Sequence, residues 1–382
     1  MSEYQYYEFA AVDRPLDRQQ QAELRSLSTR ADITATSFIN TYEWGDFKGD
    51  PRDLMARYFD AHLYLANWGS RRLMVRLPAG LLDLDTATEY CVGDSAIAWA
   101  TTDHVVLDLN RQDDEGSDEF GIDGYGRLGS IIPVRAELAA GDLRLLYVAW
   151  LRCVQSDELS DEEPEPPVPA GMRDLTGSLA AVVEFLDLDK DLLAVAASAS
   201  PDLATTAPKP AELRHWIAGL PTTEKDAILG RLITGADRQL RGELLRRYRV
   251  EHPVEQPVME PRTAGQLIEA ADQVRAERVR RTAEERERTR VRQERAARQA
   301  RQRHLDELAV DEPAAWRQVA TLIDMKRPRE YDIAVQLLVD LRELSDRDGR
   351  ATSFRQQLVE LRARHARKPS LLERLDLVGL NG

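Results

Sequence analysis

One segment of the chain, Thr263 to Leu308, has the sequence of a single long helix rich in arginine. It contains no proline, and its only glycine lies near its start. At 1.5 Å per residue, a helix of these 46 residues would span roughly 69 Å, far more than the core of a small domain requires. We therefore expect this helix to project from a domain, to bridge two domains or to carry a partner.

Charge is distributed unevenly on the two sides of Pro261. Residues 1 to 261 carry 45 Asp and Glu against 26 Lys and Arg, a balance of −19, whereas residues 262 to 382 carry 21 against 26, a balance of +5. Between Arg275 and Arg303 there are 12 arginines, five acids and no lysine. Arginine makes planar, multidentate contacts with carboxylates and phosphates. The sequence thus indicates an acidic body with a basic arm.

Such an arm could bind an acidic protein surface or a nucleic acid. The candidate contact residues are Arg275, Arg278, Arg281, Arg288, Arg292 and Arg295. The alternative is that opposite charges three or four residues apart only stabilise a solvent-exposed helix. A two-stranded coiled coil is disfavoured, because the middle of the segment offers only Val279, Ala283 and Val291 as an apolar seam. A bridging helix is favoured over a dimerisation rod.

Length and composition are typical of a protein with two or three domains. Hydrophobic residues make up 43% of the chain, enough for real cores, but no apolar run approaches the ~18 residues that a membrane span needs. The segment Met1 to Phe9 lacks a signal-peptide pattern. Cys91 and Cys153 cannot by themselves form a disulfide framework or a zinc site. We expect a cytoplasmic protein without a membrane segment, a metal or a cofactor.

The fold class expected from the sequence is α+β. Eighteen of the 24 Phe, Trp and Tyr residues lie within the first 150 positions, where β-branched and aromatic runs predict a mixed sheet domain, residues 1–155. The predicted strands are residues 4–12, 33–42, 72–77, 96–100 and 104–109. The predicted helices of this domain are residues 16–27, 51–67 and 142–155.

The rest of the chain is expected to be helical apart from one linker. Residues 156–171 mix acids with four prolines, a composition that favours an extended linker. Short amphipathic helices in series at 172–261 indicate a small bundle or a HEAT-like helical repeat, although no fixed period is found. The long helix at 262–308 and a helical C-terminal domain at 309–382 follow.

Two parts of the chain resemble known families. The tail resembles the helical C-terminal tail of some bacterial SWIM zinc-finger proteins over about 65 residues, and the zinc-binding Cys and His pattern is absent. The resemblance therefore implies a shared docking tail and not zinc or DNA contact. It rests on Trp316, Tyr331, Ala334, Leu337, Leu338, Leu341, Phe354, Leu358, Leu361, His365, Lys368, Leu371 and Leu372. The runs at 4–9 (YQYYEF), 44–51 (WGDFKGDP) and 64–69 (YLANWG), together with Asp13 to Leu16, look like an uncharacterised bacterial protein family, which implies no nameable activity.

Six residues around the predicted helix 51–67 form the best candidate pocket. Aromatic rings beside a carboxylate, a cation and an imidazole are the ingredients of a binding site. The six are Trp44, Asp46, Lys48, His62, Trp68 and Arg71. The alternative is that His62, at helical spacing from Tyr58 and Ala66, is a core or boundary residue.

No phosphate loop, zinc helix or complete nucleophile elbow occurs in the sequence. We therefore expect a non-enzymatic adaptor, or a subunit of a larger assembly, that acts by protein–protein interaction. The first alternative is a nucleic-acid-associated accessory protein that binds through the arginine-rich helix. The second is an enzyme of unknown type with its pocket between Trp44 and Arg71.

Overall fold

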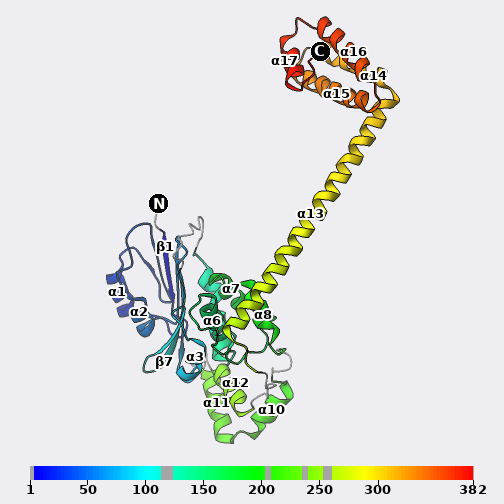
Figure 1. Cartoon of the computed structure of the whole chain (residues 1–382). Helices are drawn as coiled ribbons and strands as arrows, with labels where there is room; N and C mark the ends of the chain where they lie inside the picture. Colours follow the sequence, from blue (N-terminus) through cyan, green and yellow to red (C-terminus); the bar gives the residue numbers. More distant parts are fainter. Residues whose placement is uncertain (1–3, 113–123, 203–207, 235–239, 253–259, 382) are drawn as a thin grey trace. The chain divides into compact units, whose positions relative to one another are not determined.

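The computed structural model describes residues 4–112, 124–202, 208–234, 240–252 and 260–381 (Figure 1). It divides into two compact units, Met1–Arg278 and Val279–Gly382. The first unit holds a seven-stranded sheet followed by helices, and the second is helical. The α+β class is therefore confirmed.

All neighbouring strands of the sheet are antiparallel, in the order β2-β3-β1-β4-β5-β7-β6. Every predicted strand segment contains a strand, and the segment 33–42 holds all of β3 and the second residue of β2. The strands are β1 Gln5–Ala10, β2 Asp32–Ile33, β3 Ser37–Tyr42, β4 Ala61–Ala66, β5 Arg71–Pro78, β6 Ala96–Ala100 and β7 His104–Arg111.

The predicted helix 51–67 is wrong in its second half. Asp50 caps helix α2, Pro51–Arg57, as expected, but the helix ends there and the chain enters β4, a central strand. Both faces of β4 are buried, so its sequence AHLYLA does not alternate between polar and apolar residues as a half-buried strand does. Periodicity cannot separate such a short apolar run from a buried helix. Gly69, expected as the end of a helix, instead lies in the β4–β5 turn at φ +94°.

The two faces of the sheet pack against different helices. Leu63, Leu73 and Leu107 belong to the larger core, which includes residues of α3, α5, α6, α7 and α8. Phe9, Phe38 and Met74 on the other face belong to a core that includes residues of α1 and α2. Figure 1 shows the sheet between these two groups. The additional helices are α1 Arg18–Leu27, α3 Leu84–Tyr90, α4 Arg127–Ile131, α5 Pro133–Ala139, α6 Arg144–Gln155, α7 Gly177–Phe185 and α8 Lys190–Ser198.

The acidic segment 156–171 contains no helix or strand, but it is packed rather than free. Glu165 is only 7% exposed, and its carboxylate accepts hydrogen bonds from Arg262 Nε and Nη2 at 2.8 and 2.6 Å. The hydroxyl of Tyr147 donates to the same carboxylate. A buried charge with three donors is well compensated. This cluster fixes the segment against the start of helix α13, Ala264–Val310, whose Leu267 joins the larger core.

Three further helices of the first unit have little core of their own: α10 Pro210–Gly219, α11 Thr222–Thr234 and α12 Leu240–Glu251. Among the described residues, their buried apolar cluster is formed by Trp216, Leu220 and Tyr248, with the partly buried Leu213, Ile228 and Leu244 packed against it. We call residues 210–251 the small helical module.

The second unit begins within α13 and continues with α14 Glu312–Asp324, α15 Pro328–Arg347, α16 Ala351–Arg364 and α17 Pro369–Leu377. Its core includes Val319, Leu338, Phe354 and Leu371. The long helix agrees with its predicted range to within two residues at each end. No helix in the described ranges has an apolar stretch long enough to cross a membrane.

Candidate functional site

Trp44, Asp46 and Lys48 lie in the loop between β3 and α2. Trp44 is 68% exposed, with the guanidinium of Arg30 at 5.0 Å from its ring, and Lys48 is exposed. Asp46 accepts a hydrogen bond of 2.8 Å from the hydroxyl of Tyr7. Burial and the bond to Asp46 both raise the pKa of Tyr7, so its phenol remains protonated and ties the loop to the sheet.

His62 lies inside the sheet domain. It is 0% exposed, on β4, and its ring stacks on that of Phe9 with centroids 3.9 Å apart. Its Nδ1 lies 3.0 Å from the carbonyl oxygen of Glu8, so Nδ1 carries the proton, while Nε2 has no hydrogen-bond partner among the described residues. Burial lowers the pKa of His62 to about 3. The imidazole is neutral at pH 7 and closed to a substrate.

Arg71 serves a different part of the fold. Its guanidinium donates to the carbonyl oxygens of Phe185 at 2.9 Å and Glu184 at 3.3 Å, at the C-terminal end of α7. A cation at a helix C-terminus satisfies free carbonyls and complements the helix dipole. Arg71 packs with the larger core and His62 packs with the smaller one, so the two side chains lie on opposite faces of the sheet. Trp68 lies in the β4–β5 turn. The structure does not gather the six candidates into one pocket.

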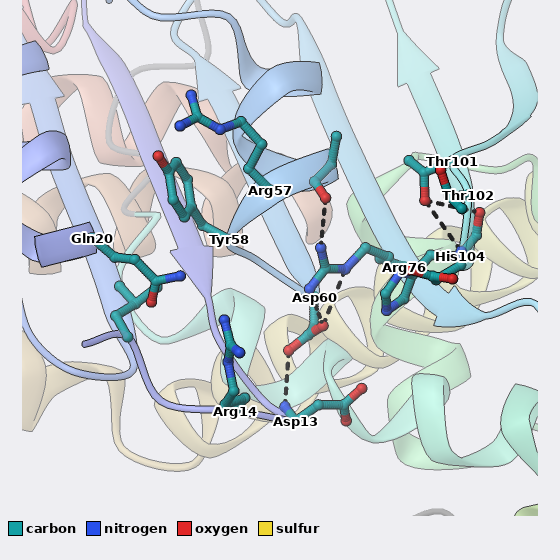
Figure 2. Close-up of a pocket in the computed structure, with 13 residues that line it drawn as sticks. Asp13, Arg14, Gln20, Arg57, Tyr58, Asp60, Arg76, Thr101, Thr102 and His104 are labelled. Atoms are coloured by element: carbon teal, nitrogen blue, oxygen red, sulfur yellow. Dashed lines mark hydrogen bonds and ion pairs between the residues drawn. The ribbon is translucent and has the colours of Figure 1, made fainter.

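A cavity of about 440 Å³ lies at one end of the sheet (Figure 2). Sequence reasoning missed it because its walls come from four separate segments of the chain. It is lined by Asp13, Arg14, Leu16, Gln20, Ala56, Arg57, Tyr58, Asp60, Arg76, Thr101, Thr102, Asp103 and His104. Figure 2 shows Arg14 and Gln20 extending toward the space beside Tyr58 and Asp60.

The deepest charge of this cavity is Asp60, which is 1% exposed. Oδ2 accepts the backbone N–H groups of Val12 at 2.7 Å and Asp13 at 2.8 Å, and Oδ1 accepts Nη2 of Arg76 at 2.8 Å. Burial alone would raise the pKa of Asp60. The hydrogen bonds from the Asp13 N–H and from Arg76 outweigh it and hold the pKa below its ordinary value.

Two buried cations near Asp60, Arg76 and Arg135, are also engaged. Arg76 donates through Nη1 to the carbonyl oxygens of Met55 and Ala56 at 2.8 and 3.0 Å. Arg135 holds the carboxylate of Asp13 in a bidentate pair and donates to the carbonyl oxygen of Arg76 at 2.7 Å. Burial lowers the pKa of His104 at the rim, and the charge of Arg76 adds to this. Asp13 and Asp60 are thus structural, and neither is a carboxylate free for acid–base work.

The six candidate arginines of α13 divide into two groups. Arg275 donates to Asp189 at 2.5 Å, and Arg278 binds Asp191 at 2.7 and 3.1 Å. Both aspartates belong to the N-terminal turn of α8, so these arginines hold α13 to the first unit. Arg281, Arg288, Arg292 and Arg295 are exposed in the second unit. Arg288 lies 3.8 Å from Glu284, and Arg292 and Arg295 have no ion-pair partner within the described residues.

Helix α11 of the small helical module exposes an apolar stripe that sequence reasoning missed. Leu229, Leu232 and Ile233 share one helix face and are 52%, 65% and 82% exposed. Two arginines of the same module are paired, Arg231 with Glu243 at 2.5 Å and Arg247 with both Glu224 and Glu251. The signal was present in the i, i+3, i+4 spacing, but spacing alone cannot tell an exposed stripe from a buried one.

Within the described residues, no group of three or more His, Cys, Asp or Glu side chains could hold a metal ion. Comparison of the chain with protein-family models, with curated proteins and with solved structures gives no significant match.

Proposed function

We propose that this protein is an adaptor that binds a second protein through the apolar stripe of α11. The observation that carries the proposal is the combination of a three-residue core in the small helical module with three large apolar side chains left exposed on one helix face. Contiguous exposed apolar surface rimmed by polar groups is typical of protein interaction sites.

The chemistry of the stripe favours an amphipathic helix of the partner as its occupant. Apolar side chains at i, i+3 and i+4 match the helix-in-groove and helix-on-helix modes of recognition. Arg231 and Arg247 are already paired within the module, with Glu243 and Glu224, so burial of the apolar stripe is the main interaction that a partner could add there.

The double substitution Leu232→Glu and Ile233→Glu is expected to weaken partner binding at least tenfold, because it removes apolar contact and places two carboxylates in the interface. Loss of an interface anchor typically costs about 2 kcal/mol or more. A photo-cross-linking residue at position 229 in the full chain would identify the partner in cells. The affinity of the purified partner for the wild type and for the Leu232/Ile233 variant is then measured by titration calorimetry.

The matched control is Val310→Glu with Leu377→Glu, two apolar side chains of the second unit that are 87% and 80% exposed. This control should bind the partner with unchanged affinity. Equal affinity of wild type and the Leu232/Ile233 variant would refute the proposal. Sedimentation of the full chain tests self-association. If the wild type is a dimer and the Leu232/Ile233 variant is a monomer, the stripe joins two copies of this chain instead.

A further inference from the structure

The part of α13 within the second unit carries arginines that the fold does not use. From Arg288 to Arg303 there are seven arginines and one acid, Glu294. Arg301 is engaged by Asp340 and Glu343 at 2.7 and 2.5 Å, and Arg290 by Glu287 and Glu294. In contrast, Arg286, Arg292, Arg295 and Arg298 are exposed and have no ion-pair partner in the described part of the chain.

These arginines surround the helix rather than forming one stripe. Each residue advances by about 100° around a helix of 3.6 residues per turn, so Arg286, Arg292 and Arg298, six apart, point about 120° from one another. Arg295 fills the angle between Arg292 and Arg298. An acidic protein surface meets one side of a helix, whereas a groove with charged walls meets several. The arrangement favours a partner that contacts the helix on more than one side.

The major groove of B-form DNA has the required dimensions and charge. It is about 12 Å wide and admits an α-helix, and its two walls are lines of phosphates. Arginine binds phosphate with planar, bidentate geometry. Helix α13 contains no Phe, Tyr or Trp, so it lacks the stacking platforms by which proteins grip single strands. DNA binding would not disturb apolar packing in the middle of α13, where Val279, for example, is 57% exposed.

We infer that the exposed arginines between Arg286 and Arg298 form a surface that binds the phosphates of duplex DNA without reading its sequence. This surface goes beyond the adaptor function, because it uses residues outside the small helical module. With Arg288 included, about five phosphates are neutralised, which gives a slope near −4.5 for log affinity against log salt. The affinity should fall roughly 500-fold between 50 and 200 mM salt.

The test measures the affinity of the full chain for a labelled 24-base-pair DNA duplex by fluorescence anisotropy, at several salt concentrations between 50 and 200 mM. The triple substitution Arg286→Gln, Arg292→Gln and Arg298→Gln should reduce the magnitude of the slope by about 3, since each phosphate contact contributes roughly one. Glutamine is a good helix former, so the helix is retained. Two duplexes of unrelated sequence should bind equally, and a single strand of equal length more weakly.

The matched control is the triple substitution Arg355→Gln, Arg364→Gln and Arg367→Gln, which removes the same charge from exposed arginines elsewhere in the second unit. Its slope should equal that of the wild type. The inference is overturned if the full chain does not bind the duplex at 50 mM salt, or if the control lowers the salt slope as much as the triple substitution in α13. It is also overturned if polyglutamate competes with the duplex at equal charge concentration. That last result would identify an acidic protein as the partner. The α11 stripe is untouched in these variants, so such a failure leaves the adaptor proposal standing.

Discussion

Replacement of Asp60 by alanine is expected to lower the free energy of unfolding of the sheet domain by about 3–5 kcal/mol, the typical cost of breaking a buried ion pair. The substitution leaves the guanidinium of Arg76, itself 8% exposed, without its carboxylate. It also removes the acceptor of the Val12 and Asp13 N–H groups. Native-state hydrogen exchange of β4 and β5 amides in the full chain measures the loss, because it reports this domain alone.

The matched control for this prediction is Asp53→Ala. Asp53 pairs with Arg57 at 3.4 Å across one turn of α2, and both side chains are 54% exposed. An exposed pair of this kind contributes about 0.3–0.5 kcal/mol. If Asp60→Ala were no more destabilising than Asp53→Ala, the Asp60–Arg76 cluster would not stabilise the domain, and its polar groups would have to be solvated.

The elements that the sequence predicts correctly are those with strong local signals. The long helix has no proline and a dense series of oppositely charged neighbours, and most strands carry β-branched and aromatic runs. Strand β4 fails because it is buried on both sides, so neither a period of two nor a helical period distinguishes it. The segment 156–171 has the composition of a linker, and it is held by residues distant in sequence, among them Tyr147 and Arg262, which lies 97 residues after Glu165.

The cavity and the proposed sites depend on information that is not local. Asp60 meets Arg76 because β4 and β5 pair in the register that sets Ala61 opposite Val75, and no spacing in the sequence reveals that register. Charge counting found the arginine helix correctly. It could not tell that Asp189 and Asp191 engage Arg275 and Arg278, whereas Arg292 and Arg295 have no ion-pair partner among the described residues. His62 lies on strand β4 and not on the predicted helix, but its complete burial agrees with the alternative that it is a core residue.

Acidification from pH 6.5 toward pH 4.5 is expected to destabilise the sheet domain through His62. Burial lowers its folded-state pKa to about 3, and the nearby charge of Arg72 adds to this, whereas the ordinary value is 6.5. The unfolded chain therefore takes up the proton first. The contribution of His62 is intact above pH 6.5 and is lost as pH falls, at up to about 1.4 kcal/mol per pH unit, or roughly 2 kcal/mol at pH 5.

The variant His62→Phe keeps a ring against Phe9 and removes the titration, so its free energy of unfolding should fall less steeply over the same range. Hydrogen exchange of β1 and β4 amides in both full-length proteins at pH 6.5, 5.5 and 4.5 measures the difference. Burial also shifts the pKa values of Glu8 and His104, but both residues are present in the two proteins and cancel in the comparison. Parallel pH profiles would show that the imidazole gains a proton inside the folded domain. Its unpaired Nε2 would then require a water or an acceptor, which would make the interior around Phe9 a polar site rather than a closed core.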